Sequence, residues 1–268
     1  MSEPELFLIF LALGFGAGIL IGMLGVGGGV IFVPSLYYLL PFYGVKTSSI
    51  PYFAISISLL SGAIATSLSA SFHLFAKNVD VKKGLLFALG SCMAAFISVV
   101  FVTSVGPESL KIIFAVVLFI VAVYMLIDVK LNKESTRTKE IYIFYLPLIG
   151  LGVGIFASFT GLGGGIIFLP VLHYLYLLDT KKAVGTSSLI TALTMIFASL
   201  SFFINKDSWV GEYDIAHIGL FVALPLGVGA IAGAKFGFNL VRKLRANSIK
   251  KIFAILLIIV VAKIIFSL

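Results

Sequence analysis

The chain of 268 residues is 60% hydrophobic and only 11% charged, with a mean hydropathy of +1.19. Apolar stretches of about 18 residues or more recur along it, which excludes a soluble domain and predicts an all-α polytopic membrane protein. The formal net charge of +8 does not indicate nucleic acid as a partner, because the lysines and arginines lie in short loops between apolar segments, where they orient membrane spans.

A glycine cluster that occurs twice divides the chain into two similar parts. Gly25-Val26-Gly27-Gly28-Gly29 is followed by Val30-Ile31-Phe32-Val33-Pro34. The pattern returns as Gly161-Leu162-Gly163-Gly164-Gly165, followed by Ile166-Ile167-Phe168-Leu169-Pro170. We therefore expect two membrane repeats, residues 1–134 and 135–268.

Apolar segments follow the same order in both repeats. The first repeat predicts a helix, the glycine cluster, a short helix and three longer spans, at residues 6–24, 25–29, 30–41, 49–73, 83–103 and 109–127. A polar linker, residues 128–140, ends this repeat. The second repeat predicts the same elements at residues 141–160, 161–165, 166–178, 186–204, about 214–238 and 249–268. Thr47-Ser48-Ser49 and Thr186-Ser187-Ser188 are expected to begin the first long span of each repeat.

Each glycine cluster lies inside an apolar run that is too long for one crossing, since a hydrocarbon core of about 30 Å needs about 20 helical residues. We expect the helix to break at the glycines and to return as a hairpin. Hairpins that return to their starting side leave Lys46, Lys111, Lys206 and Lys263 on one face and the other 15 of the 19 basic residues on the opposite face. The positive-inside rule then favours a cytoplasmic linker and two extracytoplasmic termini. The expected fold is therefore two inverted-topology repeats, each a glycine-broken hairpin followed by three transmembrane helices, as in many secondary transporters.

A break inside the bilayer leaves backbone polar groups that only protein or a water-filled cavity can satisfy. The short helices that start at Val30 and Ile166 each direct unpaired N–H groups and about half a positive charge toward the break, which favours an anion. Close helix packing by small residues is the alternative interpretation. The candidate binding glycines are Gly25, Gly27, Gly28, Gly29, Gly161, Gly163, Gly164 and Gly165.

Duplicated hydroxyls and one histidine are further candidates. Thr47, Ser48, Thr186 and Ser187 can line an anion site together with backbone amides, and helix capping alone explains them equally well. His173 lies deep in an apolar run. An ionisable group there is a functional hypothesis, with a hydrogen-bonded neutral ring as the alternative.

Enzyme chemistry is not indicated. The sequence shows no paired metal ligands, no Ser-His-Asp set and no phosphate-binding loop, so we expect no catalytic residue, no metal and no cofactor. All 11 carboxylates lie in loops or at span ends, which does not support a proton relay. Export of an anion, driven by the interior-negative potential, is therefore favoured over proton-coupled uptake.

The sequence resembles the TauE/SafE sulfite exporter family in its twin glycine clusters, the Phe-x-Pro after each, the Gly185-Thr186-Ser187 turn and the small-residue run from Gly227 to Gly237. The resemblance covers essentially the whole chain, although the first repeat has Lys46 where the second has Gly185. It implies a multi-pass plasma-membrane transporter, embedded in the lipid bilayer, for sulfite, thiosulfate, sulfonates or related organic anions. The residues alone leave open an anion channel through the same site, a membrane assembly factor without a permeant, and homo-oligomerisation.

Overall fold

The computed structural model describes residues 3–131, 142–211, 213 and 218–240. Within these residues all regular structure is helical, as predicted. The elements are α1 (Glu3–Leu24), α2 (Gly29–Leu39), η1 (Leu40–Tyr43), α3 (Ile50–Phe75), α4 (Val81–Val102), α5 (Pro107–Leu131), α6 (Tyr145–Thr160), α7 (Gly165–Pro170), η2 (Val171–Leu175), α8 (Thr180–Ile204), η3 (Lys206–Ser208), η4 (Gly219–Ala223) and α10 (Leu224–Leu240). The expected repeat boundary at residues 134 and 135 and the expected last span, residues 249–268, lie outside the described residues.

Five of the described helices are long and apolar enough to cross a membrane: Pro4–Leu24, Ile50–Phe75, Val81–Val102, Thr180–Ile204 and Phe221–Leu240. The shorter apolar helices lie beside the glycine clusters, at Gly29–Tyr43, Tyr145–Thr160 and Gly165–Leu175. The chain is therefore a multi-pass membrane protein, with short helices where the sequence predicts the helix to break.

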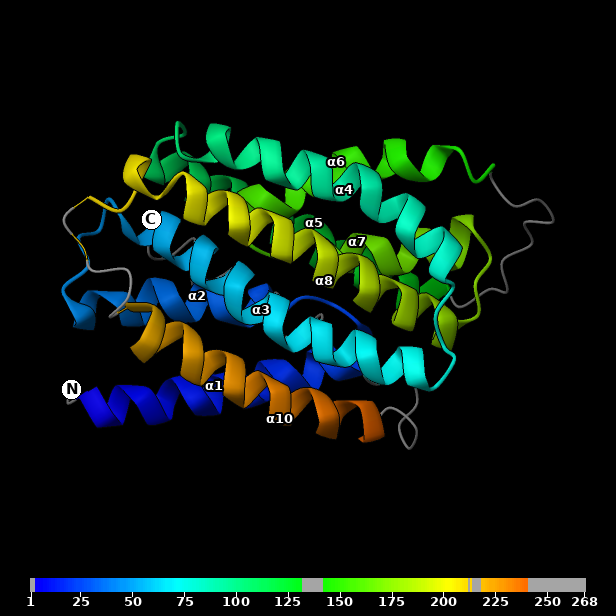
Figure 1. Ribbon diagram of the computed structural model, residues 1–268, viewed down its shortest axis with the longest axis horizontal. Helices are drawn as coiled ribbons and strands as arrows, with labels where there is room; N and C mark the ends of the chain where they lie inside the picture. Colours follow the sequence, from blue (N-terminus) through cyan, green and yellow to red (C-terminus); the bar gives the residue numbers. More distant parts are fainter. Residues whose placement is uncertain (1–2, 132–141, 212, 214–217, 241–268) are drawn as a thin grey trace.

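Both glycine-broken runs fold back as hairpins. The ring of Phe10, early in α1, lies 6.0 Å from that of Tyr43, directly after α2. In the second hairpin Tyr176, after η2, donates its hydroxyl to the carbonyl of Tyr142, before α6, over 3.4 Å. Each run therefore returns to the end of the molecule at which it started, and Figure 1 shows α1 and α2 running in opposite directions along the long axis.

The two hairpins begin at opposite ends of the molecule. At the end where α1 begins, which we call the aromatic end, the N–H of Lys46 donates to the Tyr213 hydroxyl over 2.7 Å. At the other, basic end, Lys83 Nζ donates to the carbonyl of Tyr176 over 3.3 Å. Seven described lysines lie at or near the basic end: Lys77, Lys82, Lys83, Lys130, Lys181, Lys182 and Lys235. Lys46, Lys111 and Lys206 lie at the aromatic end, so the described lysines divide as the hairpin topology predicts.

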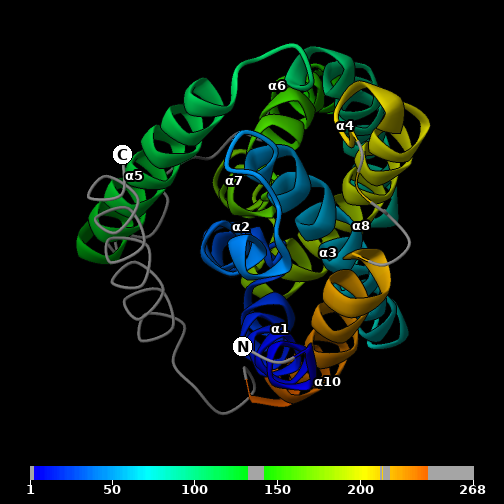
Figure 2. The same ribbon diagram turned by 90° about the vertical axis from the view of Figure 1, so that its left-hand side faces the viewer.

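Helices of the two halves pair crosswise. α1 packs along α10 and α4 packs along α6, on opposite sides of the bundle, with α3 and α8 between them (Figure 2). These pairings need glycine, because a Cβ added at Gly18 or Gly233 would collide with a backbone carbonyl of the facing helix. Between α4 and α6, a Cβ added at Gly90 or Gly154 would likewise collide with a backbone carbonyl of the facing helix. The small-residue run from Gly227 to Gly237 thus serves close helix packing.

The start of α8 differs from the prediction. α8 begins at Thr180, so the expected loop before Thr186 is helical, and Thr186-Ser187-Ser188 lie in its second turn and beyond, where they cap nothing. α3 begins at Ile50 with Pro51 in its first turn, as expected, although the capping position, Ser49, makes no side-chain bond. The first repeat inserts η1 and an irregular loop before its long helix, whereas the second adds its extra residues after α8. Pairing the two Thr-Ser-Ser motifs therefore shifted the alignment of α3 with α8.

Candidate functional site at the crossing of the two glycine breaks

The two glycine breaks cross each other in the buried centre. All residues of 25–29 and 161–165, which together we call the crossing, are buried. A Cβ added at Gly29 would collide with the carbonyl of Gly161, and one at Gly165 would lie 2.7 Å from Val26 Cα. The structure thus brings together all eight glycines that the sequence predicts as a site, and the two backbones touch without intervening side chains.

The backbone at the crossing supplies unpaired donors. α2 begins at Gly29 and α7 at Gly165, and the first turn of a helix has no intrahelical acceptor for its N–H groups. Among the described residues, the amides of Gly28, Gly29, Gly164 and Gly165 donate no hydrogen bond to another protein group. Gly25 and Gly161 occupy counterpart positions with φ of +65° and +68°, a left-handed conformation that favours glycine. The crossing therefore gathers partial positive charge from both halves.

Each break is held by a serine of the long central helix from the other half. Ser187 of α8 donates its hydroxyl to the carbonyl of Gly25 over 3.1 Å, with the carbonyl of Gly165 3.3 Å away. Ser58 of α3 donates to the carbonyl of Gly161 over 2.9 Å. Because Gly25 and Gly161 are counterparts, Ser58 is the structural counterpart of Ser187. The sequence did not indicate Ser58 as a site residue, because aligning the two Thr-Ser-Ser motifs pairs Ser187 with Ser48 instead.

Thr191, one turn after Ser187, provides a free hydroxyl at the crossing. Its side chain is fully buried, and its Oγ1 has no hydrogen-bond partner among the described groups. The Oγ1 lies 2.8 Å from the position that a Cβ on Gly165 would take. A buried hydroxyl without a partner costs free energy unless a water or a ligand satisfies it.

Met195 closes the crossing in this conformation. Its Sδ lies 2.6 Å from the Cβ position on Gly163, and its Cε lies 3.3 Å from that on Gly27. Met195 is fully buried and also packs on Gly62 of α3. A thioether side chain has three rotatable bonds and adapts its shape readily, so Met195 can move aside more easily than a branched residue.

Four of the predicted site residues do not reach the crossing. Thr47 and Ser48 are exposed in the loop at the aromatic end. Thr186 accepts a hydrogen bond from the backbone N–H of Asp80 over 2.9 Å, toward the basic end. His173 lies in the π-helical turn η2, partly buried, with Nδ1 2.8 Å from the carbonyl of Leu178. Of the predicted hydroxyls, the structure brings only Ser187 to the glycines.

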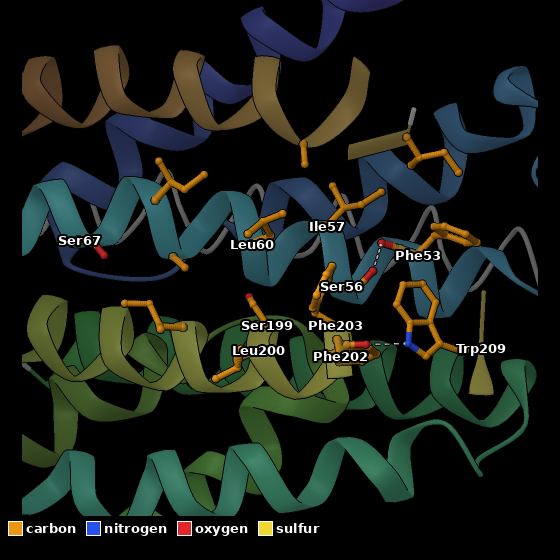
Figure 3. A pocket seen from close by; sticks show the side chains of 15 residues that line it. Phe53, Ser56, Ile57, Leu60, Ser67, Ser199, Leu200, Phe202, Phe203 and Trp209 are labelled. Carbon is orange, nitrogen blue, oxygen red and sulfur yellow. Dashed lines mark hydrogen bonds between the residues drawn. The ribbon is translucent and has the colours of Figure 1, made fainter. Parts of the chain in front are cut away.

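An apolar cavity of about 470 Å³ lies between α3 and α8 on the side away from the crossing (Figure 3). Leu60, Ile64 and Leu200 line it and are also partly exposed on the outer surface. The hydroxyl of Ser199 is buried there without a partner. Among the described residues, no charged side chain lines the cavity. Its hydroxyl groups are those of Ser56, Ser67 and Ser199, which are too few to replace the hydration of an anion.

Comparison with known proteins assigns the chain a family. The model of the family described as Sulfite exporter TauE/SafE matches residues 10–264. The chain is 28% identical over 278 residues to a probable membrane transporter protein, YunE, of Bacillus subtilis, with 97% of this chain and 98% of YunE covered. It is 29% identical over 255 residues to a probable membrane transporter protein of Haemophilus influenzae, with 94% and 96% covered. A probable membrane transporter protein of Methanocaldococcus jannaschii is 26% identical over 244 residues, with 90% and 89% covered. No solved structure was found to match the chain.

Proposed function

Because the chain belongs to the TauE/SafE sulfite exporter family, we propose that this membrane transporter moves small sulfur-containing anions across the plasma membrane, in the direction of export. The cargo class comprises sulfite, thiosulfate, sulfonates and related organic anions. The transporter works by alternating access between its two halves, with the crossing as the binding site.

The observation that carries this proposal is the arrangement of donors at the crossing. Unpaired amides of Gly28, Gly29, Gly164 and Gly165 and the unpartnered hydroxyl of Thr191 lie in the buried crossing, which contains no described carboxylate. Donors and partial positive charge without a counter-ion suit an anion and repel a cation. When Met195 moves aside, the anion takes the place that its thioether fills in the closed conformation.

The packing of the halves supports the inverted repeat and alternating access. The two hairpins begin at opposite ends of the molecule, and α1–α10 mirrors α6–α4. Each half thus contributes a hairpin, held by helices of the other half, around one central site. A continuous channel would need an open path at the crossing, where the described backbones touch.

Orientation follows from the lysines. Seven described lysines at the basic end against three at the aromatic end favour a cytoplasmic basic end and an N-terminus outside. Thr47 and Lys77 are both exposed, at the aromatic and basic ends respectively. With the buried Cys92 replaced by Ala, Thr47→Cys in intact cells should react with an impermeant maleimide, whereas Lys77→Cys should react only after permeabilisation. The reverse pattern would overturn the orientation.

Export needs no coupling ion. A membrane potential of 100 mV, negative inside, drives each negative charge outward with about 2.3 kcal/mol. Anaerobic proteoliposomes loaded with labelled sulfite should therefore show saturable flux that follows an imposed potassium-diffusion potential at equal pH. Flux that ignored the potential and followed a pH gradient would contradict uncoupled export, and large unsaturable currents would indicate a channel.

Thr191→Val tests the site itself, with Thr66→Val as its matched control. Both threonines are fully buried, but the Thr66 hydroxyl bonds to its own helix, at the carbonyl of Gly62 over 2.7 Å. Losing a hydrogen bond to a charged ligand should weaken sulfite binding about 10- to 100-fold in Thr191→Val. The ligand-free protein should not lose thermal stability, because the lost hydroxyl had no partner. Unchanged sulfite affinity in Thr191→Val would reject the crossing as the binding site.

A further inference from the structure

A line of buried polar side chains leads from the crossing toward the basic end. The hydroxyl of Ser188 lies 2.7 Å from the Cβ position on Gly25, at the crossing. It donates to the carbonyl of Val184 in its own helix over 3.0 Å, and it lies 3.4 Å from the hydroxyl of Ser69 on α3. His73 follows Ser69 by about one helical turn, so it stands on the same face of α3. We call these three residues, Ser188, Ser69 and His73, the polar column.

Among the described residues, nothing requires a histidine at position 73. It is 3% exposed, and neither ring nitrogen has a hydrogen-bond partner among the described groups. Its ring packs edge-on against Phe238, with the centroids 4.9 Å apart, a contact that a phenylalanine would make equally well. Its Cβ lies 3.0 Å from the Cβ position on Gly185. Two buried ring nitrogens without a partner among the described residues call for a water or a ligand.

The counterparts of the polar column on the other side of the crossing are apolar. Because Ser58 of α3 and Ser187 of α8 are counterparts, counting equally far along both helices pairs Leu59 with Ser188 and Ser69 with Ala198. It pairs His73 with Phe202, and each of these two stands two residues before the end of its helix. Leu59, Ala198 and Phe202 are all buried in one hydrophobic cluster. Packing at this position of the fold is therefore satisfied by apolar residues, and the polar residues occur on one side only.

The polar column ends at the basic end of the molecule. The N–H of Asn78, beyond α3, donates to the backbone carbonyl of His73 over 2.9 Å. The seven described lysines of this end outnumber its three described carboxylates, Asp80, Asp128 and Asp179. Asp80 accepts a hydrogen bond from the N–H of Lys83 and lies 3.9 Å from Lys83 Nζ. The excess of positive charge raises the local concentration of anions at this end.

We propose that a small oxyanion passes between the basic end and the crossing along the polar column, and that His73 is its contact nearest the basic end. This inference rests on the proposed function and names the route to the site. A neutral imidazole donates one N–H and a protonated one donates two, so the ring can hold an oxyanion in either form. The Ser69 hydroxyl then donates to the anion, and the Ser188 hydroxyl does so by turning away from the carbonyl of Val184. From there the anion reaches the unpaired amides of the crossing.

Single-cysteine accessibility tests the route. In a Cys92→Ala background, His73→Cys and its counterpart Phe202→Cys are reconstituted and treated with two methanethiosulfonates, one carrying a sulfonate and the other a trimethylammonium group. The sulfonate reagent should modify position 73 at least about tenfold faster than position 202, and faster than the cationic reagent does. Sulfite should slow this reaction by competing for the route. Equal, slow modification at both positions would overturn the proposed route.

A second pair of variants tests the contact with His73 in transport. His73→Phe should keep the thermal midpoint, because the ring still packs on Phe238, while sulfite flux falls about 10- to 100-fold with the loss of a hydrogen bond to a charged group. His73→Gln, which keeps donors, should restore part of the flux. Normal flux in His73→Phe would overturn the contact. If position 73 reacts selectively with the sulfonate reagent but the wild type neither moves nor binds sulfite, the route stands and the sulfite cargo fails.

Discussion

The two flanks of the crossing have the same backbone arrangement and opposite chemistry. Toward the basic end, Ser188, Ser69 and His73 form the polar column. Toward the aromatic end, the counterparts are apolar, and the ring of Trp209 packs against Phe53 and Phe202 with centroids 5.1 Å and 5.6 Å apart. The glycine positions at which helices touch recur in both parts of the chain, whereas the side chains of the two flanks differ. Close helix packing is thus matched on the two sides of the crossing, and the chemistry of the flanks is not.

The largest loss of stability is expected at the glycines of the two breaks, which lie in equivalent surroundings. A Cβ at Gly29 or Gly165 meets backbone of the other break, so Gly29→Ala and Gly165→Ala should each destabilise the protein by roughly 1–3 kcal/mol or more. Gly16→Ala and Gly152→Ala are matched controls at exposed counterpart positions with nothing within 4 Å of the added Cβ. Thermal midpoints in detergent measure all four. A large effect at only one break would contradict their equivalence.

Removing the Trp209 ring should make the aromatic flank, at Phe53 and Phe202, more accessible to water-soluble reagents. Trp209→Ala loses two edge-to-face contacts, with Phe53 and Phe202, together worth about 1–3 kcal/mol. The open fraction of this flank should therefore rise about 10- to 100-fold, measured as faster methanethiosulfonate modification of Phe202→Cys. Trp209→Phe, which keeps a ring, should change the rate much less. An unchanged rate in Trp209→Ala would show that these rings do not close the flank.

The two serines that hold the breaks should contribute alike. Ser58→Ala and Ser187→Ala each remove a buried hydrogen bond to a glycine carbonyl, at a cost of about 1 kcal/mol. Ser56→Ala is the control, because its hydroxyl bonds only to its own helix, at the carbonyl of Phe53 over 3.1 Å. Thermal midpoints of the single and double variants give the coupling between the serines. If only one of the two substitutions lowered the thermal midpoint, the two serines would not hold the breaks in equivalent ways.

The smallest effect is expected in the lateral cavity, which lies outside the polar column and adjoins the aromatic flank at Phe202 and Trp209. Ser199→Ala removes a buried hydroxyl that has no partner and introduces a better helix former, so stability should rise by about 0.5–1 kcal/mol. Sulfite flux should stay unchanged, because the cavity lies outside the polar column. Reduced flux with normal folding would place the cavity on the transport path.

The sequence predicted most of the architecture because it depends on apolar length and on glycine. Those two signals indicated both hairpins and the meeting of Gly25–Gly29 with Gly161–Gly165, and counting charges separated Lys46 from Lys77. The roles of Ser58, Thr191 and His73 could not be read in the same way. Each depends on which face of a central helix meets the other half, and the two repeats differ in loop length on either side of that helix. A repeated motif, Thr-Ser-Ser, even favoured the wrong alignment.

Trp209 is the only tryptophan in the chain. Its indole N–H donates to the carbonyl of Phe202 over 3.1 Å, between the rings of the aromatic end. The tryptophan fluorescence of the unlabelled protein therefore comes from one flank of the proposed transport site. A cycle that wets this flank would shift the emission to the red, and stopped-flow mixing with sulfite would then give the rate of opening on that side alone.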